Sequence, residues 1–317
     1  MLCAVLCTVL PALSEGAEYP SWLPPAEQVT HTLEDLPQLR ASRTSVRVEQ
    51  ANAGRLQAGA QEWSVRAGVQ QRSERLGRNY LENEIALERP IRFADKAGKD
   101  FAIGENGIGI ADAALADNWH EAARSLMAFW FNWLREERNM LRLKDYAQVL
   151  SREVQLVRQR VKAGDAPKME LMLAETELTK AQASEASAAR RAQLLASEIS
   201  TRFPGIVPSL TAPLPVPQRL EGEVVDWQQK ILTDNHELEL AKLTARQEKL
   251  IADRVILERR PDPMVGVRMA QERGGDERIV GVSVSMPLPG QYRNKLAEAA
   301  IARADGARAR AGDACAS

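Results

Sequence analysis

Few side chains in this sequence stand in patterns that could perform catalysis or hold a metal ion. The three histidines, His31, His120 and His236, are far apart, and no two of them have the spacing of metal ligands. We find no HExxH motif and no Ser-His-Asp arrangement with a nucleophile turn. The adjacent carboxylates Glu136 and Glu137 are expected on a solvated helix surface. The sequence therefore predicts no catalytic residue, no metal site and no cofactor, and the chain is not expected to be an enzyme.

Composition and motif exclude two further kinds of binding. Gly104, Gly107 and Gly109 are spaced like the glycines of a phosphate-binding loop, but neither the Lys-Ser/Thr ending nor a preceding buried strand is present. The 42 basic and 43 acidic side chains give a net charge of -1 without a basic stripe, which argues against a nucleic-acid partner. With 27% charged and only 5% aromatic residues, the chain is expected to form long exposed helices.

Three glutamates could act together electrostatically. Glu82, Glu84 and Glu88 fall on one face of an expected strand, because successive side chains of a strand point to opposite sides. In a pore this face would form an acidic patch. The solvated face of a soluble hairpin has the same pattern, so both interpretations stay open.

The strand pattern is clearest at residues 279–289, where apolar side chains alternate with glycine and serine. The apolar positions are Val280, Val282, Val284 and Met286. In a soluble protein this apolar face would meet a core. In a barrel that crosses an outer membrane it would meet lipid, while Ser283 and Ser285 line the lumen. Pro287 and Pro289 end the strand because proline cannot donate a hydrogen bond.

Similar alternation in three other segments predicts two β-hairpins, at residues 63–91 and 264–289, with polar loops at residues 73–79 and 273–277. The lipid-facing candidates are Val65, Val69, Ile85, Leu87, Val265, Val267, Val280, Val282 and Val284. Four strands cannot close a barrel by themselves. The hairpins are therefore pooled with those of other copies, or they pack on another structure.

Two long helices are expected between the hairpins. At residues 112–162 apolar positions recur in steps of four and three, which is typical of a coiled-coil seam, and residues 168–202 repeat the pattern on a returning helix. Gly164 suits a helix end, Asp165 an N-cap and Pro167 a first turn, which predicts an antiparallel hairpin with a tight tip. One side of the aromatic cluster at residues 129–133 is expected to contact the seam. The other side contacts a neighbouring helix or chain, or belongs to a thick local core.

The remaining segments complete the predicted organisation. Residues 1–17 read as an incomplete signal peptide without its basic start, residues 18–32 as a linker and residues 203–221 as a proline-rich linker. Residues 33–202 form a first repeat of helix, hairpin and long helical hairpin. Residues 222–317 repeat helix, hairpin and the start of a long helix, so that roughly a hundred residues of paired helices are expected to be missing from a truncated second repeat.

Taken together, these features resemble the TolC-type outer-membrane efflux channels, and within them the heavy-metal and cation-efflux branch. The matching pieces are the Arg-Pro-Asp-Pro at residues 260–263, the strand and prolines at 280–289, the tip region at 158–171 and the duplicated layout. The resemblance covers about residues 33–311.

The resemblance implies a mainly α fold with β, in which a homotrimer pools four strands per chain into a twelve-stranded transmembrane β-barrel. Long helices would form a periplasmic tunnel that meets a periplasmic adaptor protein and, through it, an inner-membrane pump driven by protons. Gly164 and Asp165 would form the adaptor-docking tip. Residues implied to face the lumen are Arg66, Glu82, Glu84, Glu88 and Arg268. Such a channel exports metal cations or drugs passively and is no enzyme.

Two other functions remain as alternatives. A periplasmic adaptor also contains a long helical hairpin, but adaptors flank one hairpin with compact β-domains, whereas this chain has two copies of helix, β-hairpin and helix. A soluble coiled-coil scaffold would leave the lipid-compatible strands unexplained.

Overall fold

The structure, a computed structural model, describes residues 20–75, 77–209, 216, 219 and 222–316. The predicted signal segment, residues 1–17, lies outside the described residues. In chain order the elements are α1 (Ala26–Asp35), α2 (Pro37–Ala58), β1 (Ser64–Ser73), β2 (Asn79–Pro90), α3 (Ala94–Lys162), α4 (Lys168–Arg202), α5 (Val224–Asp234), α6 (His236–Leu257), β3 (Met264–Glu272), the 3-10 turn η1 (Arg273–Gly275), β4 (Glu277–Ser285) and α7 (Gln291–Ala316).

The chain divides into two compact units, which cut across the two predicted repeats. The helical unit comprises Met1–Arg40 and Trp119–Glu221, and the sheet unit comprises Ala41–Asn118 and Gly222–Ser317. Each repeat, as predicted from sequence, therefore contributes residues to the sheet unit. The reason is that strands from both halves of the chain pair with one another.

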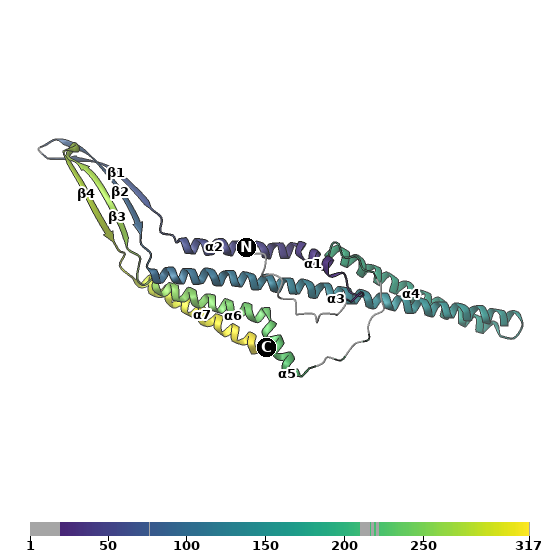
Figure 1. Ribbon diagram of the computed structural model, residues 1–317. Helices are drawn as coiled ribbons and strands as arrows, with labels where there is room; N and C mark the ends of the chain where they lie inside the picture. The colour runs from purple at the N-terminus through teal and green to yellow at the C-terminus, as the bar shows by residue number, and fades with distance from the viewer. Residues whose placement is uncertain (1–19, 76, 210–215, 217–218, 220–221, 317) are drawn as a thin grey trace. The chain divides into compact units, whose positions relative to one another are not determined.

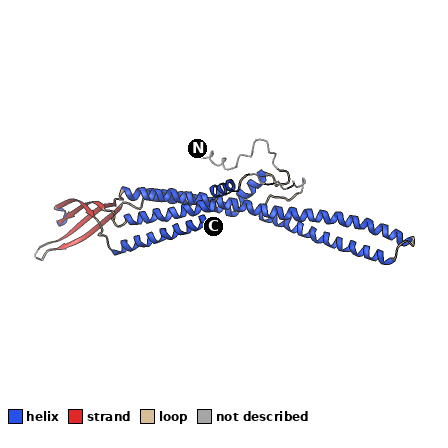
Figure 2. Ribbon diagram, turned by 90° about the horizontal axis from the view of Figure 1, so that it is seen from below, coloured by secondary structure: helices blue, strands red, loops and turns tan. Residues whose placement is uncertain are grey.

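The helical unit is built on the antiparallel pair formed by α4 and the part of α3 from Trp119 onward (Figure 2). Apolar side chains and alanines from both helices form a buried seam between them. Its members include Leu126, Trp130, Trp133, Val154, Val157, Ala181, Ala188, Ala192 and Ile199. The alanines let the two backbones approach closely. α4 spans the residues predicted for the returning helix.

The residues of the aromatic cluster in the helical unit lie on more than one side of α3. Trp130 is 2% exposed, and its indole nitrogen donates a hydrogen bond to the carbonyl oxygen of Trp22 at 3.0 Å. Phe131 packs against Trp22, with 5.8 Å between ring centroids, and Phe129 meets Phe203 edge-on at 6.4 Å. Segments of the same unit thus pack against the side facing away from the seam, as in the local-core alternative, and Phe131 stays 45% exposed there.

The sheet unit joins helices to one four-stranded antiparallel sheet of order β1-β2-β3-β4. α6 and α7 lie side by side and lead to the strands (Figure 1). The first hairpin forms within one residue of its predicted ends, and the second starts at Met264 as predicted but ends at Ser285, four residues before the predicted end at residue 289. β2 pairs with β3 and joins the two hairpins. Figure 2 shows the strands together at one end of the helices of this unit.

The long third helix begins at Ala94, whereas the sequence pattern predicted its start at residue 112. Its glycines lie inside the helix. A Cβ at Gly104 would stand 2.9 Å from the Cα of Ala53 on α2, and Gly109 faces Leu243 of α6. At Gly104, tertiary packing therefore offsets the low helix propensity of glycine, because only a missing side chain allows α2 to come so close.

Two predicted helices are each divided in two. The expected helix from residue 33 is α1 and α2, and α1 already starts at Ala26 inside the predicted linker. Leu36 takes an extended ψ of 134°, which is the conformation favoured before a proline such as Pro37. The helix expected at the start of the second repeat breaks at Asn235, whose side chain accepts a hydrogen bond from the backbone N–H of Leu238 and so caps α6.

The tip between α3 and α4 closes as a Schellman motif. Gly164 has φ of +81°, a conformation that glycine adopts without strain. Its N–H donates to the carbonyl of Val161, and the N–H of Asp165 donates to the carbonyl of Arg160 at 2.9 Å. The predicted N-cap at Asp165 was wrong, because the residue before α4 is Pro167, without a side-chain cap.

The proline-rich segment after α4 starts as a packed segment. Phe203 and Ile206 are 4% and 1% exposed. The backbone N–H of Ile206 donates to the carbonyl of Phe203. The predicted linker therefore begins with residues that belong to the core of the helical unit.

Candidate functional site

The sheet has two chemically different faces, and the register of its strands decides which side chains share a face. Arg66 lies opposite Ala86, which lies opposite Arg268, so these three occupy one face. Val65 lies opposite Leu87, and Leu87 opposite Val267, so these three occupy the other. All lipid-facing candidates fall on one face and all lumen-facing strand candidates on the opposite face.

The apolar face consists of rows that run across all four strands. One row joins Val65, Leu87, Val267 and Val282, and the next joins Ala67, Ile85, Met269 and Val280. These side chains are exposed in the single chain: Val282 is 80% exposed and Val284 is 70% exposed. No helix of the described residues covers them, so this face needs lipid or another partner to leave water.

The opposite face carries ion pairs that the sequence interpretation lacked. Glu88 pairs with Arg66 at 2.7 Å and Glu84 with Arg268 at 3.3 Å. The predicted acidic patch is thus a row of paired charges. Ser283 and Ser285 lie on this same face, opposite Gly266 and Met264. By the same alternation, Gln70 and Glu272 also lie on this face.

Arg72 is the residue that sequence reasoning missed at this face. Its Nε lies 2.7 Å from the carboxylate of Glu82, and its terminal nitrogen lies 2.8 Å from Glu272 on β3. Glu82 is 2% exposed and also accepts a hydrogen bond from Gln70 at 2.9 Å. Continuing the alternation from Arg66 through residues 68 and 70 would have indicated Arg72. What it pairs with follows only from the register.

The two outer strands leave open edges within the single chain. β1 and β4 each pair with one neighbour, so the outer backbone groups of both have no strand partner in the described residues. Every residue of β1 is exposed. An unpaired edge of this length is a template for pairing with another chain.

A charged cluster connects all four places where a helix meets a strand; we call it the junction cluster. Its residues are Arg92, Lys96, Asp100, Arg254, Glu258, Asp262 and Arg293. Arg92 donates to the carbonyl oxygens of Leu56 and Gln57 at the end of α2. Arg293 of α7 donates to the backbone carbonyl and to the carboxylate of Glu258. The cluster thereby fixes both hairpins to the same helices.

Lys96 is the buried centre of the junction cluster. Its side chain is 0% exposed, and its Nζ lies 2.9 Å from Asp262 and 3.5 Å from Glu258. The contact with Asp262 is an ion pair whose angles fall short of hydrogen-bond geometry. Burial raises the pKa of Glu258, but a hydrogen bond from Arg254 and the positive charges of Lys96 and Arg254 outweigh it and hold this pKa below its ordinary value of 4.5.

The helical tip carries exposed charges around the Schellman turn. Arg160 lies 2.8 Å from Glu170 and 3.5 Å from Asp165, which ties the end of α3 to the start of α4. Arg158 pairs with Glu175 at 2.7 Å one turn further along. All five side chains are at least 39% exposed, so they are available to a partner.

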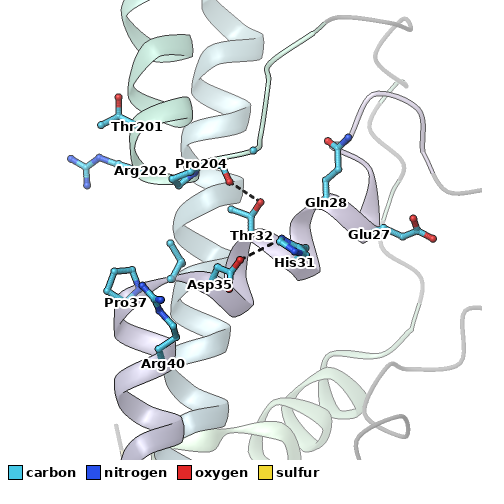
Figure 3. A pocket seen from close by; sticks show the side chains of 12 residues that line it. Glu27, Gln28, His31, Thr32, Asp35, Pro37, Arg40, Thr201, Arg202 and Pro204 are labelled. Carbon is cyan, nitrogen blue, oxygen red and sulfur yellow. Dashed lines mark hydrogen bonds and ion pairs between the residues drawn. The ribbon is translucent and has the colours of Figure 1, made fainter.

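A hollow of about 790 Å³ lies between α1, the start of α2 and the end of α4 in the helical unit (Figure 3). His31 approaches Asp35 at 3.6 Å, and Thr32 donates to the carbonyl of Pro204 at 3.1 Å. The His31 side chain is 82% exposed. The contact between Thr32 and Pro204 stabilises the turn that follows α4. The polar side chains of this hollow are not arranged around a common ligand position.

Among the described residues, every helix is too short or too polar to cross a bilayer. No protein-family model and no curated protein matches the sequence. The fold, in contrast, matches solved structures. CusC, described in terms of folding and transmembrane channel formation, has a TM-score of 0.69 at 10% identity, over 94% of this chain and 75% of that chain.

Two further structures agree. VceC, an outer membrane protein of Vibrio cholerae, has a TM-score of 0.66 at 16% identity, over 91% of this chain and 74% of its own. The open MtrE outer membrane channel of Neisseria gonorrhoeae has a TM-score of 0.66 at 14% identity, over 91% and 69%. The chain therefore shares the fold of these outer-membrane proteins. This confirms the predicted combination of long helices and a four-stranded sheet.

Proposed function

We propose that the chain is a subunit of an outer-membrane efflux channel and that its sheet lies in the outer membrane. The observation that carries this proposal is the two-faced sheet with open edges at β1 and β4. A face of exposed valines next to a face of paired charges suits a wall between lipid and water. The shared fold with outer-membrane channels supports the same conclusion.

In the proposed assembly, β4 of one copy pairs with β1 of the next, so that three copies close a barrel of twelve strands from four strands each. The lipid-facing set, Val282 among it, then points outward. Arg66, Glu84 and Arg268 point into the lumen. Closure gives the edge strands the hydrogen-bond partners that the single chain lacks.

The test is fractionation of cells that express the chain, followed by electrophoresis with and without heating. We expect a heat-modifiable trimer in the outer-membrane fraction, and single-channel currents when the purified protein is added to a planar bilayer. A chain that is recovered entirely as a water-soluble periplasmic monomer would contradict the proposal.

We further propose that the tip around Gly164 and Asp165 docks a periplasmic adaptor, through which an inner-membrane pump driven by protons delivers the cargo. The exposed charges at Arg160 and Glu170 support a polar docking surface. Asp165→Ala should reduce export in cells severalfold and leave bilayer conductance unchanged. Equal export by Asp165→Ala and wild type would remove this residue from the docking surface.

The proposed cargo is metal cations or drugs that pass through the channel passively. The metal branch rests on the sequence resemblance, and no ligand cluster among the sheet residues selects a metal. Cells lacking their own channel and supplied with this chain should accumulate less of the exported class. Parallel uptake assays with a divalent cation and with a lipophilic drug decide between the two.

A further inference from the structure

The apolar face of the sheet contains two charged side chains, which lie at opposite ends of the apolar rows. Along the four strands, the residues on this face are apolar or neutral except for Arg89 on β2 and Arg278 on β4. Arg89 lies opposite Val265 at the helix end of the sheet. Arg278 lies opposite Gln271 at the loop end. The two arginines therefore bracket the apolar band.

The contacts of Arg89 orient its guanidinium group and leave donors available for an anion. Its Nε donates a hydrogen bond to the carbonyl oxygen of Gln61 at 3.0 Å. Its guanidinium carbon lies 5.3 Å from the ring centroid of Trp63, which is 61% exposed. The terminal nitrogens of Arg89 meet no acceptor among the described residues. They present two parallel N–H donors of the kind that a phosphate accepts.

The spacing of the two arginines suits a bilayer. Val265 and Gln271, their partners on β3, are six positions apart, which corresponds to roughly 20 Å along a strand at ~3.4 Å per residue. With a strand tilt of about 40°, this is roughly 16 Å along the membrane normal, against an apolar band of about 25 Å. Two arginine side chains that extend in opposite directions toward the headgroups cover the difference.

We propose that Arg89 and Trp63 form a binding site for the phosphate of a phospholipid headgroup at the helix-side boundary of the membrane, and that Arg278 marks the opposite boundary. The inference rests on the proposed function, because it needs the apolar face to meet lipid. The indole of Trp63 has the exposed, amphipathic character of side chains that collect at membrane interfaces. The backbone contact to Gln61 holds the guanidinium at that level.

The first experiment locates Trp63 by fluorescence in vesicles of phosphatidylcholine that is brominated either near the headgroup or deep in the acyl chain. The chain has six tryptophans, and Trp63 is the one that adjoins a strand. We expect shallow bromine to quench about one sixth of the emission. Trp63→Phe should abolish this quenching. Stronger quenching by deep bromine, or none that Trp63→Phe removes, overturns the boundary assignment.

The second experiment tests the ligand by native mass spectrometry of the detergent-purified protein with added phosphatidylglycerol. Arg89→Gln should weaken binding roughly tenfold, as expected for loss of a charge-assisted hydrogen bond, and Arg89→Lys less. Arg268→Gln, which removes a charge from the opposite face of the sheet, is the matched control and should leave binding unchanged. Equal binding by Arg89→Gln and wild type overturns the site.

Two added ligands identify the source of the phosphate. Diacylglycerol, which lacks the phosphate, should bind Arg89 variants and wild type equally. Inorganic phosphate should not displace phosphatidylglycerol; if it competes at similar concentration, the site binds free phosphate and the lipid assignment is wrong. A protein that forms trimers and conducts, but whose Trp63 is not quenched, refutes this inference and leaves the channel function in place.

Discussion

The two units of the molecule differ in the polar side chains that they bury. The seam of the helical unit contains Leu126, Trp130 and Ile199, each at most 2% exposed. Of the five buried polar or charged residues found among the described positions, four belong to the sheet unit, with Lys96 and Glu82 among them. The large apolar side chains of its strands are turned outward.

This difference indicates what each unit requires in order to be stable. An apolar seam leaves water as soon as two segments of one chain meet, so the helical hairpin can be stabilised by the chain itself. A sheet with charges inside and valines outside gains little from folding in water. In the proposed assembly it becomes favourable, because lipid covers the valines and neighbouring copies complete the strand edges.

The largest effect is expected from breaking the charged interior of the sheet unit. Lys96→Ala leaves Asp262 and Glu258 without their buried partner, and removal of one member of a buried pair costs about 3–5 kcal/mol. Thermal unfolding followed by circular dichroism measures the loss. Lys99→Ala is the control, because its pair with Asp253 is over one third exposed and should contribute about 0–1 kcal/mol. Equal melting of both variants would show that the junction cluster is not a stabilising centre.

The next effect concerns the outward face. Val282→Arg places a charge in the middle of the apolar rows, at a cost of about 2–4 kcal/mol per copy if this face meets the bilayer centre. The neighbouring Ser283→Arg points to the opposite face and should assemble normally. The measurement is the amount of heat-resistant oligomer in membranes. If the two variants assemble equally well, the assignment of the faces is wrong.

A smaller effect is expected when the seam of the helical unit is overfilled. Ala188 is 0% exposed, and Ala188→Leu should cost about 1–3 kcal/mol, because the close approach of α3 and α4 leaves no room for the larger side chain. Ala186→Leu, at an exposed position of the same helix, should change stability little. Urea unfolding of the two variants compares them. No difference between them would indicate that the seam is loosely packed.

The smallest effect is a dependence of stability on pH. Because the folded-state pKa of Glu258 lies below its ordinary value of 4.5, its ionised form stabilises the fold above that pH. This contribution is lost as the pH falls from 4.5 through the lowered pKa. Glu258→Gln should therefore flatten the acid limb of the stability curve, while leaving the shape above pH 6 unchanged. If the acid limb of Glu258→Gln is the same as that of the wild type, Glu258 does not contribute to the loss of stability in acid.

Sequence patterns predicted the strands and their faces because β-structure alternates with period two. Val282 and Ser283 could be assigned to opposite faces without knowledge of any partner strand. The long returning helix was equally visible, since its alanines and leucines follow a heptad. The start of α3 could not be predicted in this way, because glycine has a low helix propensity and Gly104 is favoured by the close approach of Ala53, which lies on another element.

By itself the amino-acid sequence determined the secondary structure of the hairpins, the tight turn at Gly164 and the absence of a catalytic pattern, because these depend on local spacing and on backbone freedom. Only the tertiary structure decided that the glutamates of β2 are paired with Arg66, Arg72 and Arg268, and that Lys96 joins the two hairpins. The physical reason is that charge pairing depends on which strands and helices become neighbours. For Glu84 and Arg268, the partners are 184 positions apart in the sequence.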